Sequence, residues 1–142
     1  MSDPLYRKEL LRLAADAHGA GRLSGPHVTG HAHNPACGDK VTVDLELADG
    51  RIAQMAHDTK ACVLAQASAS ILGRELSGRT RSDVDQLRDK LVAMLAASSD
   101  APSPPFDTYA AFGGTIEYPS RHRCVLLPVE AVLAAFDAAN AG

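Results

Sequence analysis

The 142-residue sequence lacks three features that would each point to a particular class of protein. No apolar run approaches the roughly 18 residues that a membrane-spanning helix needs, so we expect no membrane partner. Lysine and arginine do not gather into one block and the formal net charge is -3, which argues against nucleic acid as a main partner. The first residues do not resemble a secretory signal, so we expect a cytoplasmic protein.

Cysteine is also scarce, and the three that are present are Cys37, Cys62 and Cys124. An odd number of widely spaced cysteines argues against a disulfide framework in a chain without an export signal. In a reducing cytosol, the open alternatives are buried structural thiols, a reactive thiol, or metal ligands. Apolar residues make up 46% and charged residues 22%, and the length suits a single soluble domain spanning residues 1–142.

Hydrophobic periodicity predicts a mixture of helices and strands. Gly19 is the expected stop of the first helix, and Pro128 predicts either a kink in the last helix or its start. The expected elements, in chain order, are a helix over 4–18, a short strand over 27–33, strands over 41–48 and about 51–57 joined by Asp49-Gly50, a helix over 62–76, a helix capped by Thr80 or Ser82, a loop over 98–107, a helical turn over 109–112, and a last helix that includes 125–136.

The hairpin around Asp49-Gly50 brings distant cysteines to one place. Its antiparallel register sets residues 39–41 opposite roughly 58–60, so Cys37 and Cys62 fall at the same end of the hairpin. Cys62 also lies at a predicted helix N-terminus, where backbone N–H groups and the helix dipole favour a thiolate. The alternative is that Cys62 is buried as a small hydrophobic side chain.

The segment Asn34-Pro35-Ala36-Cys37-Gly38-Asp39 holds a thiol and a carboxylate on either side of a glycine. Glycine admits a positive φ, so the chain can turn at Gly38 and direct both side chains to one point. Pro35 restricts its own φ and favours an extended Asn34. The alternative is an ordinary turn with a buried cysteine and a solvated aspartate.

Two neighbouring patterns also have two interpretations each. His31 and His33 share one face of a strand, where they either begin a metal site or lie half-exposed. Arg121 and Arg123 precede Cys124, where they either stabilise a thiolate or form a solvated basic turn.

Three thiols and one carboxylate make a set of four candidate ligands: Cys37, Asp39, Cys62 and Cys124. Four ligands complete a tetrahedral zinc site, and thiolates also bind iron–sulfur clusters. Because one ligand is an oxygen, we expect weaker binding of a soft metal and faster exchange, which suits a site that is emptied in use.

Three segments together resemble the U-type iron–sulfur cluster scaffold family, which includes IscU, NifU and SufU. These are the segment from Asn34 to Asp39, Cys62 followed by Ala67-Ser68-Ala69-Ser70, and Arg121-His122-Arg123-Cys124. The long separation of Cys62 from Cys124 is similar to the SufU branch, whose insertion would fall at about 79–112. The resemblance implies an α+β fold in which helices pack on one side of a three-stranded antiparallel sheet.

The resemblance also implies a function and its partners. Cys37, Asp39, Cys62 and Cys124 would bind a metal or cluster, and Cys124 would accept persulfide sulfur from a cysteine desulfurase. The protein would be a non-enzymatic scaffold that holds a transient 2Fe–2S or 4Fe–4S cluster and passes it to recipient apoproteins or carrier proteins. The alternatives are a zinc-dependent sulfur acceptor that uses the same ligands and a zinc-stabilised binding module without sulfur chemistry.

Three departures from the family pattern bear on the partners. Arg123 stands where the Isc branch has a histidine, and Tyr118-Pro119-Ser120 does not match its L-P-P-V-K chaperone motif. Lys60-Ala61 replaces the glycine that the family often has before the second cysteine. The first two departures weaken the expectation of an Hsp70-type chaperone.

Overall fold

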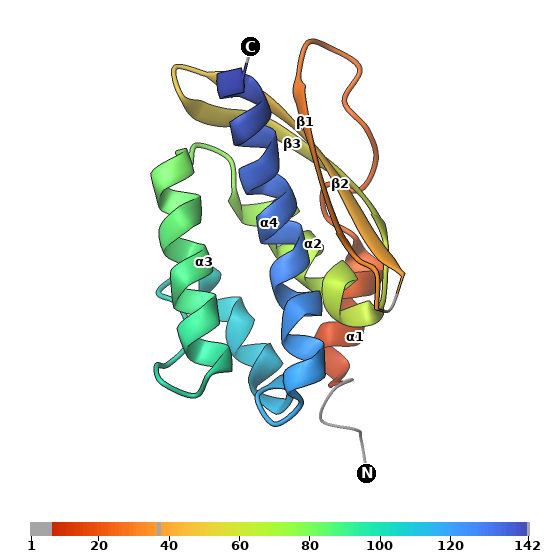
Figure 1. Cartoon of the computed structure of the whole chain (residues 1–142), viewed down its shortest axis with the longest axis vertical. Helices are drawn as coiled ribbons and strands as arrows, with labels where there is room; N and C mark the ends of the chain where they lie inside the picture. Colours follow the sequence, from red (N-terminus) through yellow and green to blue (C-terminus); the bar gives the residue numbers. More distant parts are fainter. Residues whose placement is uncertain (1–6, 37, 142) are drawn as a thin grey trace.

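A three-stranded antiparallel sheet in the order β1-β2-β3 positions the rest of the molecule, with the helices against one of its faces (Figure 1). The structure is a computed structural model that describes residues 7–36 and 38–141. This arrangement confirms the predicted α+β fold. The elements are α1 (Lys8–Asp16), β1 (Val28–Asn34), β2 (Asp39–Ala48), β3 (Arg51–Lys60), α2 (Val63–Glu75), α3 (Arg81–Leu95), the 3-10 helix η2 (Phe106–Thr115) and α4 (Pro119–Ala141).

The β2–β3 hairpin has the register that the sequence predicts. Lys40 pairs with Lys60 and Val41 with Thr59, and the turn residues Asp49 and Gly50 both adopt a positive φ. A two-residue turn in which both φ angles are positive has a twist that matches the twist of the two strands it joins. β3 continues to Lys60, beyond the predicted end near 57, because its pairing with β2 continues to the start of that strand.

Alternation along β2 divides the sheet into a covered and an open face. Val41, Val43 and Leu45 are each at most 1% exposed and face the helices. α4 lies along β1 and β2, α2 lies against β3, and α1 and α3 pack outside these two helices. The approach of α4 depends on Gly30, where an added Cβ would lie 2.3 Å from the carbonyl oxygen of Ala131.

Several predicted boundaries change in the structure. α1 ends at Asp16, so the predicted stop at Gly19 is wrong: Ala17 adopts the left-handed conformation and its N–H donates to Leu13 O at 3.1 Å. The part of the predicted helix before residue 7 lies outside the described residues. A helix start at Pro128 is also wrong, because α4 begins at Pro119, where a missing N–H is tolerated.

The segment between α2 and α4, where the resemblance to the SufU branch places an insertion, forms α3 and η2. α3 begins with Thr80, whose hydroxyl accepts the Asp83 N–H while the Asp83 carboxylate accepts the Thr80 N–H, which confirms Thr80 over Ser82 as the cap. η2 is longer than the predicted turn over 109–112 because it begins at Phe106 and continues to Thr115. Within residues 7–36 and 38–141, none of the helices combines the length and apolar character that crossing a membrane requires.

Candidate metal centre

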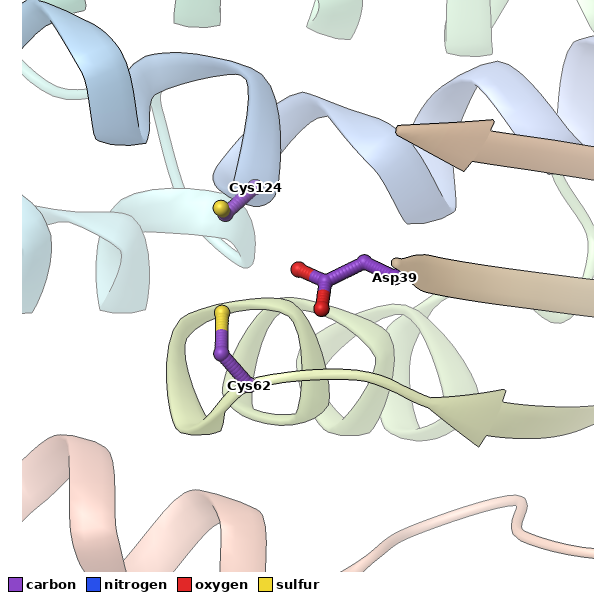
Figure 2. A group of neighbouring side chains, drawn as sticks. All are labelled: Asp39, Cys62 and Cys124. Atoms are coloured by element: carbon purple, nitrogen blue, oxygen red, sulfur yellow. The ribbon is translucent and has the colours of Figure 1, made fainter. Parts of the chain in front are cut away.

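Three side chains from three elements converge at one end of the sheet (Figure 2). Asp39 begins β2, Cys62 is the N-cap residue of α2, and Cys124 lies near the start of α4. One ligand atom from each lies within 4.8 Å of the others. Asp39 is 6% exposed, Cys124 is 1% exposed and Cys62 is half-buried, so the group is reached from the side of Cys62.

The β1–β2 connection directs Asp39 toward the helices. Gly38 adopts φ +73°, as the sequence analysis predicted, and its N–H donates to Asn34 O at 2.9 Å. Asn34 Oδ1 accepts the Ala36 N–H at 3.2 Å, and Asn34 pairs with Asp39 across the two strands. Cys37, the fourth predicted ligand, lies outside the described residues, so its role stays a prediction.

The two described cysteines share a hydrogen bond. Donation from the Cys124 thiol is the strongest influence on Cys62 and lowers its pKa from 9.0 to about 7, although burial and the negative charge of Asp39 raise it. The backbone N–H of Ala65, in the first turn of α2, lowers this pKa further, as the predicted helix N-terminus requires. A pKa near 7 means that a large share of Cys62 is thiolate at neutral pH when no metal is bound.

Asp39 carries the observation that best indicates a ligand site. Its Oδ2 atom is buried and has no hydrogen-bond partner among the described residues. Burial of such an oxygen without a partner is unfavourable, and a bound cation would satisfy it. Ligand atoms around tetrahedral zinc, at bond lengths of about 2.0–2.3 Å, lie roughly 3.5–4 Å apart, which the present spacing allows after a small adjustment.

The neighbouring histidines and arginines make other contacts. His31 and His33 are exposed, and among the described residues they do not join a group of three metal-capable side chains. His122 directs Nε2 to the carbonyl oxygens of Thr115 and Ile116, at 3.1 and 3.0 Å. Arg123 is exposed and donates to His33 O at 3.4 Å.

Sequence reasoning missed a buried hydroxyl network behind the centre. Ser68 Oγ donates to Val125 O at 2.7 Å and accepts from the Tyr109 hydroxyl at 2.8 Å. Burial raises the pKa of Tyr109, so this phenol stays protonated and able to donate. The network joins α2, η2 and α4 close to Cys124. Only a serine on an otherwise apolar helix face signals it in the sequence.

Comparison with known proteins gives consistent matches. The family model described as NifU-like N terminal domain matches residues 5–121. The iron–sulfur cluster assembly scaffold protein IscU of Thermotoga maritima is 24% identical over 123 residues, 87% of this chain and 86% of that protein. The zinc-dependent sulfurtransferase SufU of Bacillus subtilis is 24% identical over 131 residues, 92% of this chain and 88% of that protein.

A solved structure extends this likeness to the whole fold. The N-terminal part of a NifU-like protein from Brucella abortus is 32% identical to this chain and superposes with a TM-score of 0.91, covering 98% of this chain and 96% of that one. The sheet and helices described above are thus those of a known fold. Because the family model spans most of the sequence, the chain belongs to the NifU-like N-terminal domain family.

Proposed function

We propose that this protein is an iron–sulfur cluster assembly scaffold. It receives iron, takes sulfur from a cysteine desulfurase, and passes the cluster to recipient apoproteins or carrier proteins in the cytoplasm. The observation that carries the proposal is the meeting, in one group, of two thiols and a buried carboxylate oxygen that has no hydrogen-bond partner in the described part of the chain. Membership of the NifU-like family and the scaffold name of the Thermotoga maritima relative support it.

The ligand set suits a cargo that is held and then released. Thiolates from Cys62 and Cys124, with Cys37 as a third, bind iron strongly, whereas the Asp39 carboxylate is a harder and weaker ligand for such a centre. The half-buried Cys62 leaves one side open to a partner. In this proposal the protein positions thiolates and is not itself an enzyme with turnover.

Sulfur transfer requires a thiolate and an accessible donor. We assign Cys124 as the acceptor: its thiolate attacks the outer sulfur of the donor persulfide, a new S–S bond forms, and the donor's S–S bond breaks. The donor leaves as a thiolate and the proton stays on the transferred sulfur, so no outside oxidant or reductant is needed. The Cys62 thiolate, which accepts the hydrogen bond from the Cys124 thiol, takes up the proton that Cys124 loses.

A second function, zinc-dependent sulfur acceptance, is favoured by a specific observation. The relative from Bacillus subtilis is named a zinc-dependent sulfurtransferase, and its match covers 92% of this chain. Two sulfurs and one oxygen within 4.8 Å also suit zinc. Bound zinc would hold the thiols as thiolates and protect them from oxidation.

Protein purified without oxygen tests these alternatives directly. Metal, acid-labile sulfide and persulfide are measured after incubation with iron, cysteine and a purified cysteine desulfurase, first without and then with dithiothreitol, a thiol that supplies the two electrons by which persulfide sulfur becomes sulfide. A scaffold takes up iron and, once dithiothreitol is present, sulfide, whereas a zinc-dependent acceptor keeps its zinc and gains only persulfide before dithiothreitol is added. Failure to acquire either sulfide or persulfide would refute both proposals.

Cysteine substitutions separate sulfur chemistry from structural zinc binding. We expect Cys62→Ser and Cys124→Ser to abolish transfer while the protein stays folded by circular dichroism. A zinc-stabilised binding module would instead unfold when either ligand is lost, because structural zinc contributes directly to folding free energy. Unfolding of both variants would therefore favour the binding module.

A further inference from the structure

The open face of the sheet, opposite α2 and α4, carries a groove of about 590 Å³ at the end of the sheet where the metal centre lies on the other face. Side chains that line it include His31, His33, Lys40, Thr42, Asp58 and Lys60. They come from all three strands, so the groove crosses the sheet. Further along this face, Arg22 and Leu23 cover β2 through their hydrogen bonds to Asp44, which leaves the groove at the end that carries the centre.

Two lysines lie opposite each other in this groove. Lys40 and Lys60 are a directly paired position of β2 and β3, and both are exposed. Like charges in such a pair destabilise a sheet. The formal net charge of the chain is -3, so this pair of positive charges is not part of a generally basic surface. A partner that brings negative charge would convert the unfavourable pair into a favourable contact.

Each of three cations is close in the sequence to one ligand of the centre. Lys40 follows Asp39, Lys60 is two residues before Cys62, and Arg123 precedes Cys124. Because successive strand residues face opposite sides, Asp39 points to the helices while Lys40 points to the groove.

Arg123 extends this charge beyond the sheet. Its guanidinium donates to the carbonyl of His33 on β1, so a third cation lies at the edge of the groove. Asp58, paired with Thr42 further from the centre, would repel an anion from the other part of the groove.

We propose that the groove is the docking site for an acidic segment of the sulfur-donor protein, with its carboxylates at Lys40 and Lys60. This inference rests on the proposed function, because it assumes that a donor brings sulfur to the centre. An extended segment there would hold the donor at the end of the sheet where Cys62 opens to solvent. Charge complementarity of this kind mainly speeds association and selects the partner.

The test uses a charge reversal that should separate binding from folding. Lys40→Glu removes the like-charge pair and gives Lys60 an opposite charge across the strands, so we expect an unchanged or higher melting temperature. We expect the dissociation constant for a purified cysteine desulfurase, measured by calorimetry at low salt, to rise about tenfold or more. The matched control is Lys90→Glu at an exposed position of α3, which makes the same change in net charge and should stay within about twofold of the parent.

Specific results would overturn the inference. These are an unchanged dissociation constant in Lys40→Glu, an equal loss in Lys90→Glu, or full competition by millimolar inorganic phosphate, which would indicate a site for small anions. If Lys40→Glu does not fold, Lys60→Glu makes the mirror-image exchange and carries the same expectations. A parent protein that accepts sulfur while Lys40→Glu binds equally well leaves the proposed function intact and refutes only the groove. A parent that neither binds the desulfurase nor accepts its sulfur refutes both.

Discussion

Two buried aspartates on β2, five positions apart, lie on opposite faces of the sheet and differ in their hydrogen bonding. The Asp44 side chain is fully buried on the open face and accepts hydrogen bonds from Arg22 Nε at 2.7 Å, Thr29 Oγ1 at 2.7 Å and the Leu23 N–H at 3.1 Å. Asp39 lies on the helix face, and its buried Oδ2 has no hydrogen-bond partner among the described residues. The hydrogen bonding of the carboxylate is therefore satisfied at Asp44, whereas at Asp39 one buried oxygen is left unsatisfied among the described residues.

The difference indicates which carboxylate has a structural role. Asp44 holds the segment before β1 against the sheet, and every contact it needs is supplied by the chain. The Asp39 Oδ2 atom has no such contact within residues 7–36 and 38–141, and the carboxylate faces two thiols. A buried polar group that stays unsatisfied requires an explanation, and a ligand that the chain itself does not supply is the one we favour.

The largest expected effect is on folding, from Asp44→Ala. The change leaves the Thr29 hydroxyl and the Leu23 N–H without their acceptor, and we expect the free energy of unfolding to fall by about 2–3 kcal/mol. Arg22 is half-exposed, so its loss of a partner adds little. Urea denaturation of the metal-free protein measures the change. Asp58→Ala on the same face is the control, and an equal loss in both variants would contradict the role of Asp44.

The contribution of Asp44 should also appear in the pH dependence of the unfolding free energy. Burial raises the pKa of Asp44, but the hydrogen bonds from Arg22, Thr29 and the Leu23 N–H outweigh it and lower the pKa from 3.8 to about 2. Because the folded pKa is the lower one, this stabilisation is complete above pH 4 and is lost as the pH falls toward 2, an effect of about 2 kcal/mol.

Denaturation of Asp44→Asn at several pH values isolates this contribution. We expect its unfolding free energy to vary less than that of the parent protein between pH 5 and pH 2. Parallel curves for the two proteins would show that other carboxylates dominate acid unfolding.

The sequence predicted the fold where the signals were local. Alternation along β2 and the Asp49-Gly50 turn determined the hairpin register, and that register brought Asp39 and Cys62 to one end of the sheet. The placement of Cys124 beside them depended on the family resemblance, because no local pattern links it to the hairpin. Its hydrogen bond with Cys62 then followed from the structure alone.

Contacts between distant segments were not predictable from local patterns. Arg22 reaches Asp44 from the irregular segment before β1, Thr29 reaches it from the paired strand β1, and the Tyr109–Ser68 bond joins residues 41 positions apart. Such pairs depend on how loops cross the finished sheet and helices. The lysine pair of the groove was also missed, although its register was available, because the charges face away from the predicted centre.

A smaller effect, on the rate at which Cys62 is alkylated, is expected from Cys124→Ala. Loss of the Cys124 hydrogen bond should raise the pKa of Cys62 from about 7 toward or above 9.0. Fewer thiolates form at pH 7, although each is more nucleophilic, so we expect alkylation of Cys62 to slow about fivefold. Mass spectrometry of metal-free protein resolves each cysteine, and Cys37→Ala is the comparison. An unchanged Cys62 profile in Cys124→Ala would contradict the shared hydrogen bond.

Asp39→Ala should have the smallest effect on folding. Its Oδ2 atom gives up no hydrogen bond within the described residues, so we expect the metal-free unfolding free energy to change by no more than about 1 kcal/mol, on the stabilising side.

The main consequence of Asp39→Ala should be a change in the rate at which bound metal is released. Without the weaker oxygen ligand, bound metal or cluster should leave more slowly when a chelator is added, and Asp39→Asn, which keeps the size but not the charge, tests whether the anion drives release. A loss of stability in Asp39→Ala close to that of Asp44→Ala would mean that the two carboxylates have the same structural role, and faster metal loss than in the parent would mean that Asp39 retains the metal.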